Sequence, residues 1–126
     1  MSIVLLLVLL VVFQLKHLIS DFYLQGRYML GKFNANGWFL PLFSHVLVHG
    51  AMTFFICVLC VPFAISIYLS LFDMAIHFTV DRWKVIRSRA TDSSQPLFWH
   101  LLGVDQMFHH LTHYIIIFVI FIYFSI

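Results

Sequence analysis

The sequence predicts an all-α polytopic membrane protein, a four-transmembrane-helix bundle, and its composition and apolar runs support this. Hydrophobic residues make up 63% of the 126 residues and charged residues only 10%. The mean hydropathy is +1.01. This apolar share exceeds that of soluble domains, and the apolar runs are long enough to cross a bilayer, which takes about 20 helical residues. A chain of this length holds about four such helices, so residues 1–126 are expected to form a single transmembrane domain.

Four spans follow from the positions of apolar runs and helix-breaking residues. The first covers about residues 3–25; it lacks the basic start and cleavage site of a signal peptide, so we expect it to be retained. The second, about residues 41–61, begins at Pro41, which suits the first turn of a helix. Pro62 marks a tight reversal before the third span, about residues 63–81. The fourth covers about residues 97–125.

The distribution of cations predicts the orientation of these spans. The basic residues of the first connection are Arg27 and Lys32, and those of the third are Arg82, Lys84, Arg87 and Arg89. Because cytoplasmic loops carry an excess of Lys and Arg, both connections are expected in the cytoplasm of a bacterium, with both termini outside the inner membrane. Trp38, Trp83 and Trp99 fall at the same ends of the spans, where indole rings favour the interface.

Every span carries polar side chains spaced four residues apart, which places them on one helix face. These stripes are His17-Asp21-Gln25, His45-His49, Asp73-His77-Asp81 and Asp105-His109-His113. Counted from the cytoplasmic ends, the stripes coincide in depth within roughly 10 Å. Because ionisable groups at membrane depth are costly and commonly functional, the stripes predict one shared site in the cytoplasmic half of the bilayer.

The residue types of the stripes favour a divalent metal. The chain has no Glu, and four of its five Asp residues lie in the stripes. A mixed imidazole and carboxylate set suits zinc, with manganese or iron as alternatives. The predicted metal ligands are His17, Asp21, His45, His49, Asp73, His77, Asp81, Asp105 and His109. The alternative for each pair is interhelical hydrogen bonding, which contributes about 0.6 kcal/mol on average.

Further residues are assigned supporting or structural roles. Gln25, Lys84, Gln106 and Thr112 are expected to hydrogen-bond the ligands or contact substrate. His113 lies deepest, whereas His100 and His110 lie off the stripes and are expected to hydrogen-bond at the interface or between helices. Cys57 and Cys60 form a lone C-x-x-C and are expected to act as small buried hydrophobic residues.

Taken together, these motifs resemble a family of small bacterial inner-membrane proteins classed as a domain of unknown function. The resemblance rests on HxxxDFxxQ from His17 to Gln25, on His45 with His49-Gly50, on HxxxDxxK from His77 to Lys84, and on DQxxHxxT from Asp105 to Thr112. It covers nearly the whole chain. It implies a polytopic helical membrane protein and brings no established reaction.

Three functional hypotheses remain open from the sequence. The first is a metal-dependent hydrolase acting on a membrane lipid or another substrate at the cytoplasmic leaflet, with Asp21, Asp81 and Asp105 as the catalytic carboxylates. The second is a non-catalytic subunit or anchor, acting as a homo-oligomer or with a membrane-complex partner. The third is a proton or metal-ion conductor, which flux measurements in liposomes would distinguish. The net charge of +2 gives no reason to expect nucleic-acid binding.

Overall fold

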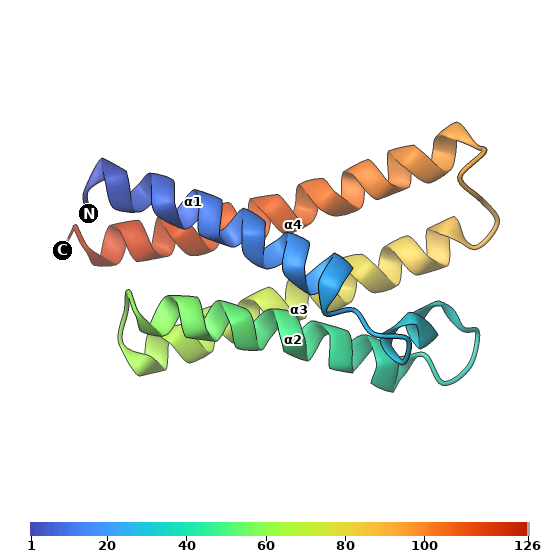
Figure 1. The fold of residues 1–126 in the computed structure, drawn as a ribbon, viewed down its shortest axis with the longest axis horizontal. Helices are drawn as coiled ribbons and strands as arrows, with labels where there is room; N and C mark the ends of the chain where they lie inside the picture. Colours follow the sequence, from blue (N-terminus) through green and yellow to red (C-terminus); the bar gives the residue numbers. More distant parts are fainter. Residues whose placement is uncertain (126) are drawn as a thin grey trace.

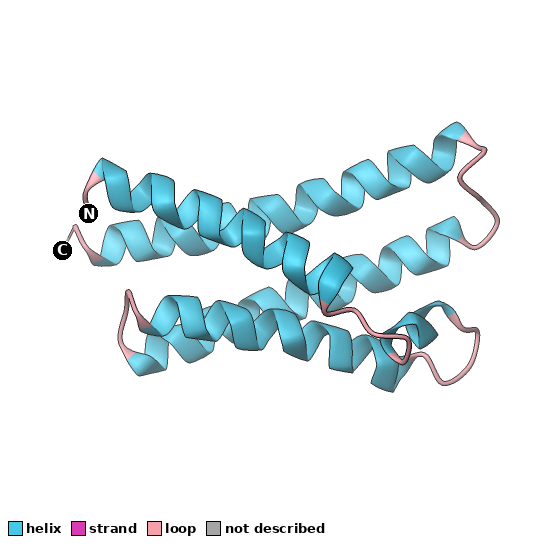
Figure 2. Ribbon diagram, in the orientation of Figure 1, coloured by secondary structure: helices cyan, strands magenta, loops and turns pink. Residues whose placement is uncertain are grey.

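The computed structural model describes residues 1–125 as a bundle of long antiparallel helices joined by short connections (Figure 1). The elements are α1 (Ile3–Leu18), the π-helical turn η1 (Ile19–Tyr23), the 3-10 helix η2 (Met29–Phe33), α2 (Phe39–Val58), α3 (Phe63–Ser88) and α4 (Pro96–Tyr123). Figure 2 shows helices and loops only in this part of the chain. Four helical stretches, with η1 counted in the first, are long and apolar enough to cross a membrane.

Local sequence signals explain where the helices begin. The Ser2 hydroxyl caps α1 by accepting a hydrogen bond from the Leu5 amide at 3.2 Å. Pro62 directly precedes α3, and Pro96 occupies the first turn of α4, where a missing amide hydrogen has no cost. The termini and the tight turn between α2 and α3 lie at one end of the bundle, and the other two connections lie at the opposite end (Figure 1).

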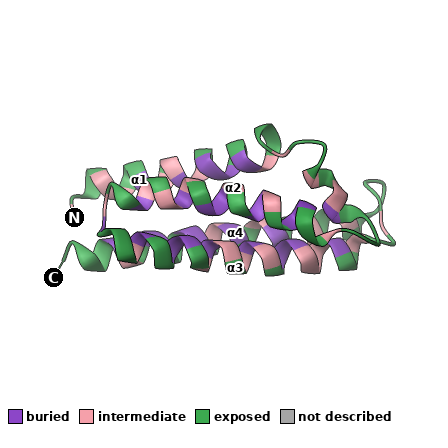
Figure 3. Cartoon of the chain, turned by 90° about the horizontal axis from the view of Figure 1, so that it is seen from below, coloured by how far each residue is buried: buried purple, intermediate pink, exposed green. Residues whose placement is uncertain are grey.

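The outer surface of the bundle is apolar, as a lipid-facing surface requires. Buried residues form stripes along the inner sides of the helices, and exposed residues occupy the outer sides (Figure 3). Large hydrophobic side chains on these outer sides stay exposed: Phe55 is 66% exposed, Tyr68 73% and Phe118 60%. Exposed apolar area on this scale is typical of a membrane-contacting surface rather than of a soluble monomer.

The interior divides into an apolar half and a polar half. Near the termini, Leu9, Cys57, Leu69, Ile116 and Ile120 belong to one buried hydrophobic cluster. Towards the other connections, buried His, Asp and Lys side chains lie among a few buried apolar residues such as Leu42 and Val85. The polar residues predicted to share one depth therefore do lie inside the bundle, on its half away from the termini.

A close approach of α2 and α3 sets the width of this polar half. A Cβ atom added to Gly50 would lie 2.3 Å from Met74 Cγ, so only glycine fits without displacing that side chain. The Ser70 hydroxyl donates a hydrogen bond to the Gly50 carbonyl at 2.7 Å. Gly50 directly follows His49, and the contact therefore fixes the distance between the histidines of these two helices.

Several helix ends differ from the ranges expected from the sequence, and two of these differences affect the polar half. The first helical stretch ends at Tyr23, so Gln25 follows the helix instead of extending its polar stripe. The third continues to Ser88, seven residues past the expected position 81. Burial of Val85, which is 3% exposed, and an ion pair between Lys84 and Asp105 at 3.0 Å stabilise these additional turns.

Candidate metal centre

A π-helical turn places Asp21 at the centre of the polar interior. The Leu24 amide donates to the Ile19 carbonyl at 2.9 Å, an i to i+5 hydrogen bond that widens the helix by one residue. Such turns are rare in proteins, and those that do occur are frequently found at functional sites. Within this turn, Ser20 is fully buried and donates to Met52 Sδ at 3.1 Å, which anchors the widened turn to α2. Asp21 is thereby directed at α2 and α3.

Three histidines from α2 and α3 surround one oxygen of Asp21. The Oδ1 atom lies 2.9 Å from His49 Nε2, 3.3 Å from His45 Nε2 and 3.9 Å from His77 Nε2. The Nε2 atoms of His45 and His77 are 3.2 Å apart. All three histidines are fully buried. Three elements therefore direct one carboxylate oxygen and three imidazole nitrogens at the same point.

The dimensions of this cage fit a tetrahedral metal ion. Zinc bonds of about 2.0–2.1 Å place neighbouring ligand atoms of a tetrahedron about 3.3 Å apart. The separations from Asp21 Oδ1 run from 2.9 to 3.9 Å, and the candidate ligand atoms of Asp21, His45, His49 and His77 all lie within 4.8 Å of one another. We refer to these four residues as the Asp21 cage.

A second group with metal-ligand chemistry adjoins the cage and shares His77 with it. It consists of His77, Asp81 and His109, whose ligand atoms also lie within 4.8 Å of one another. His109 Nε2 lies 3.4 Å from Asp81 Oδ1 and 3.3 Å from Asp105 Oδ1. Both His109 Nε2 and Asp105 Oδ1 are buried without a hydrogen-bond partner in the described part of the chain. Such atoms, close together and unbonded, are suited to sharing a cation.

Ion pairs with lysine distinguish the other aspartates of the polar interior from Asp21 of the cage. Lys16 pairs with Asp73 at 2.7 Å, Lys32 with Asp81 at 2.6 Å and Lys84 with Asp105 at 3.0 Å. Among residues 1–125, Asp21 is the one aspartate of the polar interior that has no lysine partner. Its charge faces imidazoles and no lysine, so a protonated imidazole or a bound metal ion is the counter-charge that its surroundings can supply.

His17, predicted to be a metal ligand, lies outside both groups of possible metal ligands and contacts Asp21. Gln106 Nε2 donates to Asp105 Oδ2 at 3.1 Å, and because a carboxylate only accepts, Gln106 Oε1 must face His17. His17 Nε2 lies 3.0 Å from this oxygen and 3.2 Å from Asp21 Oδ2. Nε2 therefore carries a hydrogen and donates to these acceptors, whereas Nδ1 of His17 keeps its lone pair and is buried without a hydrogen-bond partner in the described part of the chain.

The cage histidines are oriented by one another. The ring centroids of His49 and His77 are 3.7 Å apart, and those of His45 and His49 are 4.8 Å apart. The Nδ1 atoms of all three rings are buried without a hydrogen-bond partner in the described range. A metal-bound imidazole usually donates from its second nitrogen to protein or water. In the described range, the three rings instead pack against one another.

Asp73, another predicted metal ligand, belongs to a separate buried cluster. Its Oδ2 atom accepts hydrogen bonds from Lys16 Nζ at 2.7 Å and from the Thr53 hydroxyl at 2.5 Å. His113 Nε2 lies 3.4 Å from Lys16 Nζ and 3.8 Å from Asp73 Oδ1. Asp73 is thus neutralised by a lysine and lies outside both groups of possible metal ligands. We refer to these four residues as the Lys16 cluster.

Of the remaining predicted residues, only some contact the site. Gln106 and Lys84 contact the site as described, but the Thr112 hydroxyl donates to the Phe108 carbonyl of its own helix at 2.8 Å. Gln25 lies beyond η1 and is half-buried. Cys57 and Cys60 are free thiols, one buried and one half-buried, with Cys57 in the apolar cluster.

Two lysines of the polar interior were not among the predicted site residues. Lys16 is 2% exposed and Lys32 is 4% exposed. A signal for Lys16 exists in the sequence, because a lysine directly before His17 interrupts an otherwise apolar span. Lys32 gives no such signal: it lies in a connection, and only the folding of η2 against α2 and α3 brings it to Asp81.

Comparison with protein families gives one match, which covers nearly the whole chain. The family model described as "Protein of unknown function (DUF3307)" matches residues 6–126. Comparisons with curated proteins and with solved structures gave no match.

Proposed function

The chain belongs to the DUF3307 family of unknown function, and we propose that it is a metal-dependent membrane hydrolase whose metal is bound in the Asp21 cage. One observation carries the proposal: a half-buried carboxylate without a lysine partner faces three buried imidazole nitrogens at separations close to those of a tetrahedral zinc site. Zinc is the favoured ion, because four nitrogen and oxygen ligands in a small cage suit it better than a six-coordinate manganese or iron.

The residues around the cage provide the remaining requirements of hydrolysis. When bound, zinc supplies Lewis acidity and makes hydroxide available near neutral pH. Asp81, whose Oδ1 atom lies 3.7 Å from His77 Nε2, would serve as the general base that takes a proton from water. Lys32 holds the other oxygen of Asp81 and fixes its orientation. His17 and Gln106 hold Asp21 and Asp105 in place from α1 and α4.

The exposure of residues around the cage supports a substrate that enters from the membrane, at the end of the bundle where the basic connections lie. Asp21 is 16% exposed and Lys84 is 21% exposed, whereas the cage histidines are fully buried. We therefore place the open side of the site at Asp21, in the leaflet next to the connections of residues 24–38 and 89–95. In the proposed orientation this is the cytoplasmic leaflet of a bacterial inner membrane.

A structural metal site in a non-catalytic subunit is the second candidate, and the ligand count favours it. Structural zinc sites are closed by four protein ligands, whereas catalytic sites keep one position open. The cage has four candidate ligands if His77 binds the same ion as Asp21, and three if His77 is drawn to Asp81 and His109. As a subunit, the protein would act as a homo-oligomer or with a partner in the membrane.

Ion conduction has less support, because the polar interior is closed on one side. Within residues 1–125, the buried charged groups continue from His17 to the Lys16 cluster and end there, and the Ser66 hydroxyl nearer the termini donates to the Val61 carbonyl. Beyond the Lys16 cluster, towards the termini, the bundle is filled by buried Leu9, Cys57 and Ile120. A conducting path needs polar or wetted groups across the full thickness of the membrane.

The Asp21→Asn variant tests the proposal, because it keeps the shape of the side chain and removes its charge. We expect the gently purified parent protein to contain one zinc ion per chain and the variant to bind zinc at least about tenfold more weakly. Asp92→Asn, at an exposed residue of the third connection, is the matched control and should retain zinc. Elemental analysis and competition with a chelator provide the measurement.

Turnover separates the two candidates. For a hydrolase, hydrolysis of lipid esters should be lost in Asp21→Asn and after chelation while the helices remain folded. Loss of folding on chelation, without any turnover in the metal-loaded protein, would identify a structural site. A parent protein that holds no stoichiometric metal, or an Asp21→Asn variant that holds as much as the parent, would overturn the metal centre itself.

A further inference from the structure

A continuous groove follows the seam between α1 and α4 on the outer surface of the bundle. One part, about 400 Å³ in volume, is lined by Leu10, Gln14, His110 and Tyr114 together with Val11 and Leu15. The adjoining part, about 340 Å³, shares Leu10 and Tyr114 and continues along Leu6, Ile117, Phe118 and Phe121. Each volume lies within the range of about 300–1,000 Å³ typical of ligand pockets.

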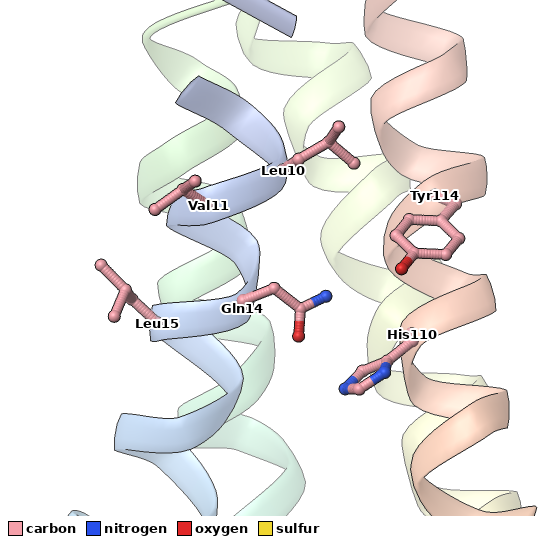
Figure 4. Close-up of a pocket in the computed structure, with 6 residues that line it drawn as sticks. All are labelled: Leu10, Val11, Gln14, Leu15, His110 and Tyr114. Carbon is pink, nitrogen blue, oxygen red and sulfur yellow. The ribbon is translucent and has the colours of Figure 1, made fainter. Parts of the chain in front are cut away.

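Polarity changes along this groove in one direction. The part near the termini is walled by aliphatic and aromatic side chains. In the other part, Leu10 and Gln14 point towards α4, whereas His110 and Tyr114 point towards α1 (Figure 4). The next side chains along the same seam are His17 and Gln106, which hydrogen-bond each other at 3.0 Å.

The polar end of the groove reaches the metal centre. The ring centroids of His110 and His17 are 5.6 Å apart, and the two rings meet edge to face. His17 in turn contacts Asp21 of the cage at 3.2 Å. A ligand in the groove that contacts His110 is therefore connected to the cage through the imidazole rings of His110 and His17.

From this arrangement we infer that the groove binds an uncharged acyl ester lipid, with its chain along the apolar part and its ester group beside Gln14 and His110. The inference rests on the proposed function, for which it names the substrate class. A bilayer lipid of the leaflet next to the basic connections points its chain towards the end of the bundle that holds the termini (Figure 1), and the apolar part of the groove runs the same way, from Leu10 to Leu6 on α1.

The chemistry of the wall selects the uncharged ester. Gln14, His110 and Tyr114 provide hydrogen-bond donors for ester oxygens. Neither part of the groove is lined by Lys, Arg or Asp in the described residues, and the nearby Lys16 is occupied by Asp73. A phosphate drawn into this wall at membrane depth would lack a cation, which is costly, whereas an alkane would leave the polar groups unpaired.

Photo-crosslinking in nanodiscs tests the inference with three probes that carry the same diazirine-labelled chain: a monoacylglycerol, a lysophosphatidylcholine and an alkane. We expect the monoacylglycerol to label the groove residues of α1 and α4. The double variant Gln14→Leu/His110→Phe should reduce this labelling by about tenfold, as the loss of two hydrogen bonds predicts. Tyr68→Phe, which removes a hydroxyl from the exposed face of α3, should leave labelling unchanged.

Should the double variant fail to fold, Gln14→Met alone serves, with an expected reduction of about threefold. The inference is overturned if labelling is spread evenly over all lipid-facing helices, if the groove variants leave it unchanged, or if the charged lipid or the alkane labels the groove as strongly as the monoacylglycerol. Asp21→Asn separates this result from the proposed function, because it should lose zinc and keep the labelling. Labelling retained in a protein that never binds metal would leave a lipid site without a hydrolase.

Discussion

Single charged residues determine how the polar half of the bundle is held together, and Lys16 is the clearest case. It lies on α1, the helix with the most apolar sequence, yet its ammonium group is buried and bonded to Asp73. Removing one partner of a buried ion pair leaves the other charge unpaired, which costs about 3–5 kcal/mol, whereas replacing both by apolar residues is close to neutral.

Lys16→Met is therefore expected to lower the free energy of unfolding by about 3–5 kcal/mol, and the double variant Lys16→Met/Asp73→Leu to recover most of that loss. Denaturant unfolding of the purified protein in micelles, followed by circular dichroism, measures both. Arg87→Met, at an exposed position near the end of α3, is the control and should change stability by less than about 1 kcal/mol. If the single and double variants were equally unstable, Lys16 and Asp73 would not be stabilising each other as a pair.

At the scale of one residue, the spacing in the sequence indicated which polar side chains lie inside the bundle, but not which partners they meet. The spacing of four placed Asp21, His45, His49 and His77 on inward faces, and the structure brings these four together. The same spacing cannot tell which partner a side chain meets across the bundle. Asp73 was expected among the metal ligands because it lies one turn from His77, but it faces Lys16, whose contact depends on the rotation of α1 against α3.

Among the elements, η1 has the largest effect on the site, because it sets the direction of Asp21. Deleting Ile19 would remove the extra residue of the π turn and place Asp21 three positions after His17 instead of four. This turns its carboxylate by about 100° around the helix axis. We expect the deletion to weaken zinc binding at least about tenfold, as Asp21→Asn does, while the helical content stays the same.

Ile19→Ala controls for this deletion, since it keeps the residue count and changes a side chain that is 38% exposed. It should bind zinc like the parent protein. Zinc affinity and far-ultraviolet circular dichroism are measured on both variants. Parental zinc binding in the deletion variant would mean that the wider turn does not position Asp21.

Element boundaries were predictable where the chain itself marks them. Pro62 and Pro96 stand at the observed starts of α3 and α4, and the four apolar runs all became helices. Apolar periodicity is insensitive to a π turn, and it cannot show that α3 continues past Asp81, because those last turns are held by Val85 packing and the Lys84–Asp105 pair rather than by hydropathy. The position of η2 against α2 and α3 is likewise a tertiary contact without a local pattern.

On the scale of the whole molecule, the distribution of charge along the bundle axis predicts its orientation. Both termini lie at one end, and the connections that contain Arg27 and Arg89 lie at the other. Lys32 is buried against Asp81 and is therefore not one of the exposed cations at that end of the bundle. Arg27, Arg87 and Arg89 remain exposed at the same end, and the positive-inside rule counts cations in short connections of this kind.

Single-cysteine labelling tests this orientation. After Cys57 and Cys60 are replaced by alanine, we expect Ser2→Cys to react with a membrane-impermeant maleimide on intact bacterial cells, and Ser93→Cys to react only after lysis. Both serines are exposed, one at the start of α1 and one in the connection between α3 and α4, so access in the folded protein is equivalent. The opposite labelling pattern would place the basic connections and the open side of the Asp21 cage in the outer leaflet. The acyl ester would then have to be supplied from that leaflet, with its chain directed towards the cytoplasm, because the polar end of the α1–α4 groove faces the same side as the cage.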